Sequence, residues 1–170
     1  MIDELPPKMP VPRGKIAQIT AFCDADHAGD KITRRSHTGI LLYVNKAPIS
    51  WFSKRQNTVE AATFGSEYIA LRICTEKIKA QRYKLRMFGI PIDGPATAYV
   101  NNESVVKSST RPESQLKKKH LSICYHAVRE CIASGIVRVG WIESEANLSD
   151  LLTKLLPGTK LRGLVQKILY

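Results

Sequence analysis

The sequence lacks the features that would place it in a membrane or cross-link it through disulfides or zinc. No apolar run approaches the roughly 20 residues that a membrane-spanning helix needs. Residues 1–14 also lack the apolar stretch that a secretory signal peptide contains. Its four cysteines, Cys23, Cys74, Cys124 and Cys131, show no C-x-x-C spacing. We therefore expect an intracellular protein that contacts no membrane, with its cysteines as small buried apolar residues in a reducing compartment.

Acidic residues are few for a chain of 170 residues. Fifteen Asp and Glu stand against 26 Lys and Arg, which leaves a formal net charge of +11. Such a surplus favours a polyanionic partner, most often nucleic acid. Two plainer interpretations stay open: a solvated basic surface, and a fragment whose charge is balanced elsewhere in a larger protein.

The length fits one domain with a single core, preceded by a short proline-rich segment. Residues 1–14 contain four of the nine prolines. Because proline breaks helices and interior strands, we interpret this segment as a linker or tail. Residues 15–170 are interpreted as one globular domain.

Apolar patterning and turn residues predict an α/β domain. A strand over 15–23 and a hairpin of strands over 37–45 and 47–53 would form three antiparallel strands. A helix over 63–88 then leads to a strand over 96–100, and this alternation predicts that the later strands pair in parallel with the first. The remaining expected elements are a short helix to residue 108, a loop over 110–119, a helix to 134, a strand over 136–142, and helices over 148–155 and 160–169.

Polar or acidic residues stand at the edges of four of these elements. Asp24 ends the first strand, Glu67 lies on the apolar seam of the long helix, Asn101 follows the fourth strand, and Asp150 begins a later helix. A buried acid is costly unless it pairs or holds a cation, so we expect these four side chains to meet in one metal-binding cluster. Ordinary roles as helix caps, turn residues or partners of a helix dipole stay open for each.

Several longer motifs carry a resemblance to a known family. CDADHAGDKITRRSHTG, PISWFSKRQNTVE, SEYIAL, YVNNESVV, KKKHLSICYHAVRE and NLSDLLTKLLPG occur in this order over about residues 16–158. They resemble the ribonuclease H domain of Copia-type (Pseudoviridae) LTR retrotransposon polyproteins. The resemblance implies a ribonuclease H-like fold with a five-stranded mixed sheet flanked by helices. The proline-rich start then resembles the connection that follows a reverse transcriptase.

The resemblance also implies an activity and the residues for it. The family cleaves the RNA strand of an RNA/DNA hybrid with two Mg²⁺ ions, for which Mn²⁺ can substitute, during reverse transcription. The matching catalytic and metal-ligand positions are Asp24, Glu67, Asn101 and Asp150. The implied partners are the hybrid and the upstream reverse transcriptase domain, and the implied location is a cytoplasmic virus-like particle. The sequence does not indicate an oligomeric state.

Asn101 departs from the family, which usually has Asp at this position. An amide keeps one oxygen but loses the negative charge and adds an N–H donor that cannot bind metal. We therefore expect this form to be impaired in cleavage but able to bind hybrid. Two explanations stay open: a substitution made deliberately to trap substrate, and a copy of the element that has decayed or been co-opted. Gly65 likewise stands where many relatives carry a further acid.

Basic and amide-rich segments are the candidates for contacts with the nucleic acid backbone. Trp51 is interpreted as a core residue because it lies within a strand. Alternatives to an enzyme are a non-catalytic nucleic-acid-binding module and a structural connection domain on the same fold. The candidate nucleic-acid-binding residues are Arg34, Arg35, Lys54, Arg55, Gln56, Asn57, Lys117, Lys118, Lys119 and His120.

Overall fold

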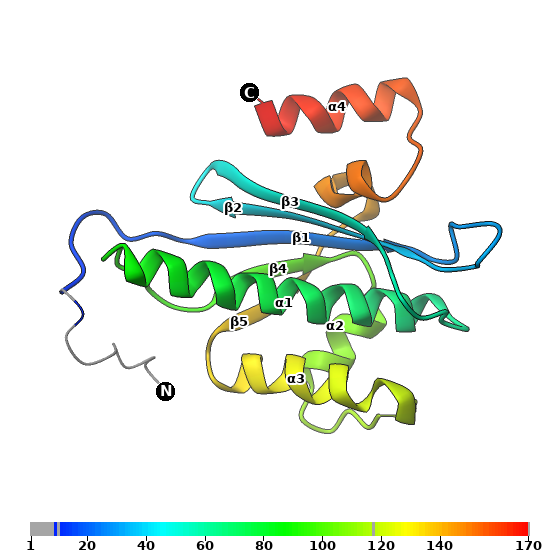
Figure 1. Ribbon diagram of the computed structural model, residues 1–170, viewed down its shortest axis with the longest axis horizontal. Helices are drawn as coiled ribbons and strands as arrows, with labels where there is room; N and C mark the ends of the chain where they lie inside the picture. The colour runs from blue at the N-terminus through cyan, green and yellow to red at the C-terminus, as the bar shows by residue number, and fades with distance from the viewer. Residues whose placement is uncertain (1–8, 10, 117, 170) are drawn as a thin grey trace.

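The fold is built on one mixed sheet with the strand order β3-β2-β1-β4-β5 (Figure 1). β1 (Ile19–Asp26) pairs antiparallel with β2 (His37–Val44), and β2 pairs antiparallel with β3 (Ala47–Arg55). On its other side β1 pairs in parallel with β4 (Ala96–Val100), which pairs in parallel with β5 (Val137–Trp141). The predicted five-stranded mixed sheet is therefore confirmed.

The helices cover the two faces of the sheet unequally. In the computed structural model, which describes residues 9, 11–116 and 118–169, three helices lie on one side of the sheet and α4 lies on the other (Figure 1). None of the helices in these ranges is long and apolar enough to cross a membrane. The helical elements are α1 (Thr63–Met87), α2 (Glu103–Thr110), α3 (Ser122–Ala133) and α4 (Gly158–Leu169), with the short 3₁₀ turns η1 (Lys119–Leu121), η2 (Ser144–Ala146) and η3 (Leu148–Leu152).

The main core lies between the sheet and α1. Alternate residues of β1 such as Ala21 and Cys23 are fully buried, and they belong to one apolar cluster with Leu71 and Ile78 of α1. A smaller cluster on the other face joins β2 to η3 and α4. Cys23, Cys74 and Cys131 are buried, as predicted, but Cys124 is only partly buried; all four are free thiols.

Three expectations about local structure are wrong. The predicted helix over 148–155 is instead the 3₁₀ turn η3, because the buried Asn147 side chain accepts hydrogen bonds from Ser149 and donates one to the Cys23 carbonyl, which fixes a short turn on β1. Trp51 is 73% exposed because β3 is an edge strand whose side chains are nearly all exposed. β1 also continues past the expected end to Asp26, since its ladder with β2 extends that far.

Gly39 is the point at which η3 approaches the sheet. It pairs with Asp24 across β1 and β2. A Cβ at this position would lie 2.6 Å from Thr153 Cγ2 and 2.9 Å from the Ser149 carbonyl oxygen, so only a glycine leaves room for this packing. The missing side chain thus brings η3 and the residues after it next to Asp24.

We expect Gly39→Ala to destabilise the domain by about 1–3 kcal/mol, because the new methyl group must push the η3 backbone away from the sheet. Urea unfolding followed by circular dichroism measures the effect. Gly163→Ala is the matched control: Gly163 lies inside α4, and a methyl group added there would meet no atom within 4 Å beyond its own helix backbone. Alanine is therefore expected to stabilise by about 0.5–1 kcal/mol. Equal effects of the two substitutions would contradict the close packing at Gly39.

Candidate metal-binding site

Four polar side chains meet where β1 and β4 end beside the start of α1. Figure 1 shows β1 and β4 side by side in the sheet. Because these two strands are parallel, Asp24 on β1 and Asn101 directly after β4 lie at the same end of the sheet. Glu67 comes from the second turn of α1, and Asp150 comes from η3 on the other face of the sheet. The exposed fractions of Asp24, Glu67 and Asp150 are only 0%, 4% and 1%, so three acids are buried at one place.

Lys154 lies between two of these acids. Its Nζ is 3.0 Å from Asp24 Oδ1 and 2.8 Å from Asp150 Oδ1. Burial disfavours the charge on this lysine, but the two carboxylates outweigh burial and raise the pKa of Lys154 above its usual value. Lys160, from α4, places its Nζ 3.0 Å from the other oxygen of Asp150. Two lysines therefore neutralise the pair of aspartates.

Further hydrogen bonds fix the position of Asp24. The Thr153 hydroxyl donates to Asp24 Oδ2. Asn147 Nδ2 donates to the Cys23 carbonyl oxygen over 3.2 Å, which holds η3 against the strand that carries Asp24. Asp26, two residues on, accepts from the His37 backbone N–H instead of joining the central group. Asp24 therefore has a fixed orientation before any ligand arrives.

Glu67 is the acid with the least compensation. Burial, and then the negative charge of Asp24, raise its pKa from 4.5 to about 9. The Ala25 backbone N–H donates to this carboxyl group, but Glu67 Oε2 is buried without a hydrogen-bond partner. Glu67 is therefore protonated at neutral pH in the protein as it stands.

Asn101 makes a contact that an aspartate could not make. Its Nδ2 donates to Asp24 Oδ1 over 3.3 Å and to the Ser144 hydroxyl over 3.4 Å. An aspartate here would bring a second carboxylate against Asp24 in place of this donor. Asn101 Oδ1 is buried without a hydrogen-bond partner, like Glu67 Oε2.

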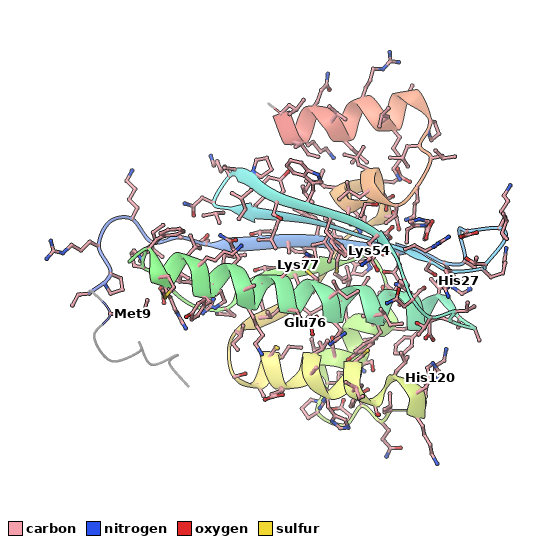
Figure 2. The ribbon with its side chains drawn as sticks, viewed as in Figure 1. Met9, His27, Lys54, Glu76, Lys77 and His120 are labelled. Atoms are coloured by element: carbon pink, nitrogen blue, oxygen red, sulfur yellow. The ribbon has the colours of Figure 1, made fainter. Side chains whose placement is uncertain are left out.

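A small open pocket leads to this group. Its volume is about 430 Å³, and Glu67, Asn101 and Lys154 lie in its wall. Asp26 and His27 line it from β1 and the turn that follows, and Figure 2 shows His27 at the end of the molecule where α1 begins. The pocket thus reaches Glu67, Asn101 and Lys154, and Asp24 and Asp150 lie behind Lys154.

The donor set fits a hard divalent cation in its chemistry. Carboxylate and amide oxygens are the ligands that Mg²⁺ and Mn²⁺ prefer, and two buried oxygens, on Glu67 and Asn101, have no hydrogen-bond partner. Within residues 9, 11–116 and 118–169, however, no group of three His, Cys, Asp or Glu side chains is arranged to hold a metal ion as it stands. The Lys154 ammonium instead contacts one oxygen of Asp24 and one of Asp150.

Five of the ten predicted nucleic-acid-binding residues line a single cleft. Lys54, Arg55, Gln56, Asn57 and His120 line a cleft of about 540 Å³ between the end of β3 and the start of α3, and Figure 2 shows Lys54 and His120. Gln56 differs from the others because it is buried and donates to Thr38 Oγ1 and the Ser66 carbonyl, so it supports the loop.

Several members of this set already have protein partners. Arg55 pairs with Asp30 at 2.5 Å, and His120 Nε2 lies 2.9 Å from Glu60 Oε2. The Glu60 carboxylate fills the space beside Gly65, where a side chain would collide with it. Arg34, Arg35 and Lys119 lie at or near the surface, Lys118 Nζ lies 6.0 Å from the Phe64 ring, and Lys117 lies outside the described residues. Contact with nucleic acid stays a prediction for the whole set.

Lys154, Lys160 and Thr153 were not among the residues expected at the site. The signal for Lys154 is its spacing: it lies four residues after Asp150, which on a helical turn places an acid beside a base. Lys160 and Thr153 carry no such signal, because their contacts depend on how α4 and η3 fold back onto the sheet.

Solved structures with the same architecture define the class of this domain. The chain is similar to the crystal structure of LC11-RNase H1 in complex with RNA/DNA hybrid, with a TM-score of 0.62 and 18% identity over 80% of this chain and 94% of that chain. It is also similar to the foamy viral protease-reverse transcriptase in complex with RNA/DNA hybrid, with a TM-score of 0.54 and 14% identity over 90% of this chain and 22% of that chain. The fold is therefore ribonuclease H-like.

Curated sequences narrow the origin of the domain. The chain is 31% identical over 92% of its length to the retrovirus-related Pol polyprotein from transposon RE1 of Arabidopsis thaliana, and 30% identical over 84% to that from transposon TNT 1-94 of Nicotiana tabacum. It spans about 11% of the length of each of these relatives. No protein-family model matches it. The chain is homologous to part of the retrotransposon Pol polyproteins and has a ribonuclease H-like fold.

We expect Glu67→Gln to stabilise the metal-free protein by about 2–3 kcal/mol at pH 7. Because the folded-state pKa is raised to about 9, the folded protein holds a proton that the unfolded chain releases above its pKa of 4.5, so stability falls as pH rises between these values. Gln cannot ionise, so the Glu67→Gln protein does not lose this stability as the pH rises. Urea unfolding in EDTA at pH 4 and pH 7 measures the difference, which is expected to be small at pH 4.

Glu76→Gln is the control for this measurement. Glu76 lies near the middle of α1 (Figure 2), where it is half-exposed and pairs with Arg72. Its replacement is expected to change stability by less than about 0.5 kcal/mol at either pH. A Glu67→Gln protein that is no more stable than wild type at pH 7 would contradict a protonated Glu67.

Proposed function

We propose that this domain is the RNA/DNA-hybrid endoribonuclease of a retrotransposon reverse transcriptase, impaired in the present form by Asn101. The observation that carries the proposal is the meeting of Asp24, Glu67, Asn101 and Asp150, from separate parts of the chain, at one end of a ribonuclease H-like sheet and beside an open pocket. Each of the four offers a hard oxygen ligand.

The roles of the chain's own groups follow from their positions. Asp24, Glu67 and Asp150 would hold the cations, with the Asn101 amide oxygen as a weak fourth ligand. Two bound Mg²⁺ or Mn²⁺ ions supply an activated water and neutralise charge on the attacking and leaving oxygens. Thr153 and Asn147 keep Asp24 in one orientation, and Glu67 has to lose its proton before it can serve as a ligand.

The proposed substrate is an RNA/DNA hybrid, recognised by its backbone. Two of the similar solved structures, LC11-RNase H1 and the foamy viral protease-reverse transcriptase, are complexes with such a hybrid, and the net charge of +11 suits a polyanion. The cleft that includes Lys54, Asn57 and His120 is the proposed binding surface for the part of the nucleic acid next to the cleavage site. The proposed partner is the polymerase part of the polyprotein, within a cytoplasmic virus-like particle.

A non-catalytic binding module is the second candidate. Asn101 donates to Asp24, and two lysines neutralise Asp24 and Asp150, so the site is charge-balanced without a cation. Such a module would bind hybrid through the same basic residues and would not cut it.

We expect Asn101→Asp to raise cleavage of a labelled RNA/DNA hybrid in Mg²⁺ by about 100-fold or more, because it restores a charged ligand worth several kcal/mol to the transition state. Gel analysis of the RNA strand, with and without EDTA, measures the rate. The control is the double variant Asn101→Asp with Asp24→Asn, which is expected to be inactive. Binding of hybrid without cutting by the Asn101→Asp protein would favour the binding module and overturn the enzyme.

We expect Lys54→Ala to weaken hybrid binding several-fold and to lower the slope of log affinity against log salt by about 1, because one phosphate contact is lost. Fluorescence anisotropy over a salt series measures both quantities. Lys46→Ala removes a lysine from the turn at the opposite end of the same hairpin and is expected to leave the slope unchanged. The same slope for the wild type and the Lys54→Ala protein would exclude Lys54 from the interface.

A further inference from the structure

The Lys154 ammonium lies between the carboxylates of Asp24 and Asp150. Its Nζ lies within 3.0 Å of one oxygen of each carboxylate, so a positive charge already sits at the point where the two acids face each other. The side chain is 34% exposed and lines the pocket with Glu67 and Asn101, although both of its partners are almost fully buried. We propose that Lys154 competes with the divalent cation for this position. Its ammonium takes the place of the cation in the metal-free protein, and an incoming cation has to displace it.

The geometry gives Lys154 a way out of the site. A lysine has four methylene groups and can carry its ammonium several ångströms without movement of the backbone. The pocket of about 430 Å³ lies directly beside it and opens to solvent. Once displaced, the ammonium would stand in the pocket wall, where a phosphate of the bound strand is its natural partner.

Lys160 does not have the same role. Its Nζ lies 3.0 Å from Asp150 Oδ2 and 3.5 Å from Glu145 Oε2, and it makes no contact with Asp24. It therefore neutralises Asp150 from the outer side and does not occupy the point between the two aspartates.

Lys154 affects the stability of the metal-free protein and its affinity for the cation in opposite directions. Without a cation, Lys154 prevents two buried carboxylates from repelling each other, and the loss of one partner of such a pair is strongly destabilising. With a cation present, the same ammonium has to be moved, which weakens cation binding. Lys154 thus makes the protein stable without metal at the expense of metal affinity.

The test is Lys154→Met, made both in the present chain and in the Asn101→Asp background. Isothermal titration with MnCl₂, without nucleic acid, is expected to show binding about tenfold tighter or more than in the matching Lys154 protein. In EDTA the variant is expected to melt about 10 °C lower, and saturating Mn²⁺ is expected to recover most of this loss. Lys167→Met, in the last turn of α4, is the control and is expected to change neither quantity.

A second measurement needs no substitution at Lys154. Acetylation of the unmutated chain and of the Asn101→Asp protein by acetic anhydride, read by mass spectrometry, is expected to increase severalfold at Lys154 when Mg²⁺ is added. Acetylation at Lys167 is expected to stay constant. This measurement decides the question if Lys154→Met fails to fold in EDTA.

The outcomes separate this inference from the proposed function on which it rests. Unchanged or weaker Mn²⁺ affinity in Lys154→Met, no Mn²⁺ binding by any variant, or constant acetylation of Lys154 would overturn the competitor role. If Asn101→Asp cuts the hybrid while Lys154→Met leaves the affinity unchanged, the nuclease stands and the competitor role fails. If Lys154→Met tightens Mn²⁺ binding while no variant cuts, the competitor role stands and the nuclease fails.

Discussion

Two buried carboxylates that face each other need a positive charge between them, and this requirement governs the end of the sheet. Asp24 is fixed by the strand that forms the centre of the fold, and Asp150 is brought to it from the opposite face. Their charges cannot be solvated, since both side chains are almost completely buried. The surrounding lysines meet the requirement in the metal-free protein, and divalent cations are the other way to meet it.

Asn101 belongs to the same balance of charge. With an amide at this position and a proton on Glu67, the negative charges of two aspartates face the positive charges of two lysines. A carboxylate at position 101 would add negative charge beside Asp24, which protonation or a bound cation would have to offset. The amide of Asn101 avoids this repulsion and donates a hydrogen bond to Asp24 instead.

The sequence was sufficient to predict the strands, α1 to α4 and the meeting of four polar side chains, because apolar periodicity and the polar residues at element ends are local signals. Trp51 was misplaced because the order of strands decides which one is an edge, and no local pattern encodes that order. Lys154 was missed for a related reason. Its contact with Asp24 depends on η3 being a short turn seated on Gly39, which couples residues more than a hundred positions apart.

The close approach at Gly39 has a consequence for how the site is assembled. The segment from Glu143 onward supplies Asp150 and both lysines, and the exposed residues Glu143 to Glu145 join it to the rest of the domain. Asp24, Glu67 and Asn101 belong to the part made earlier. The four polar side chains and their lysine partners are therefore divided between two stretches of sequence, and neither stretch alone carries the complete set. A growing chain that still lacks the segment from Glu143 onward has Asp24, Glu67 and Asn101 but not Asp150 or the two lysines, so this charge-paired group is complete only once the last segment has been synthesised.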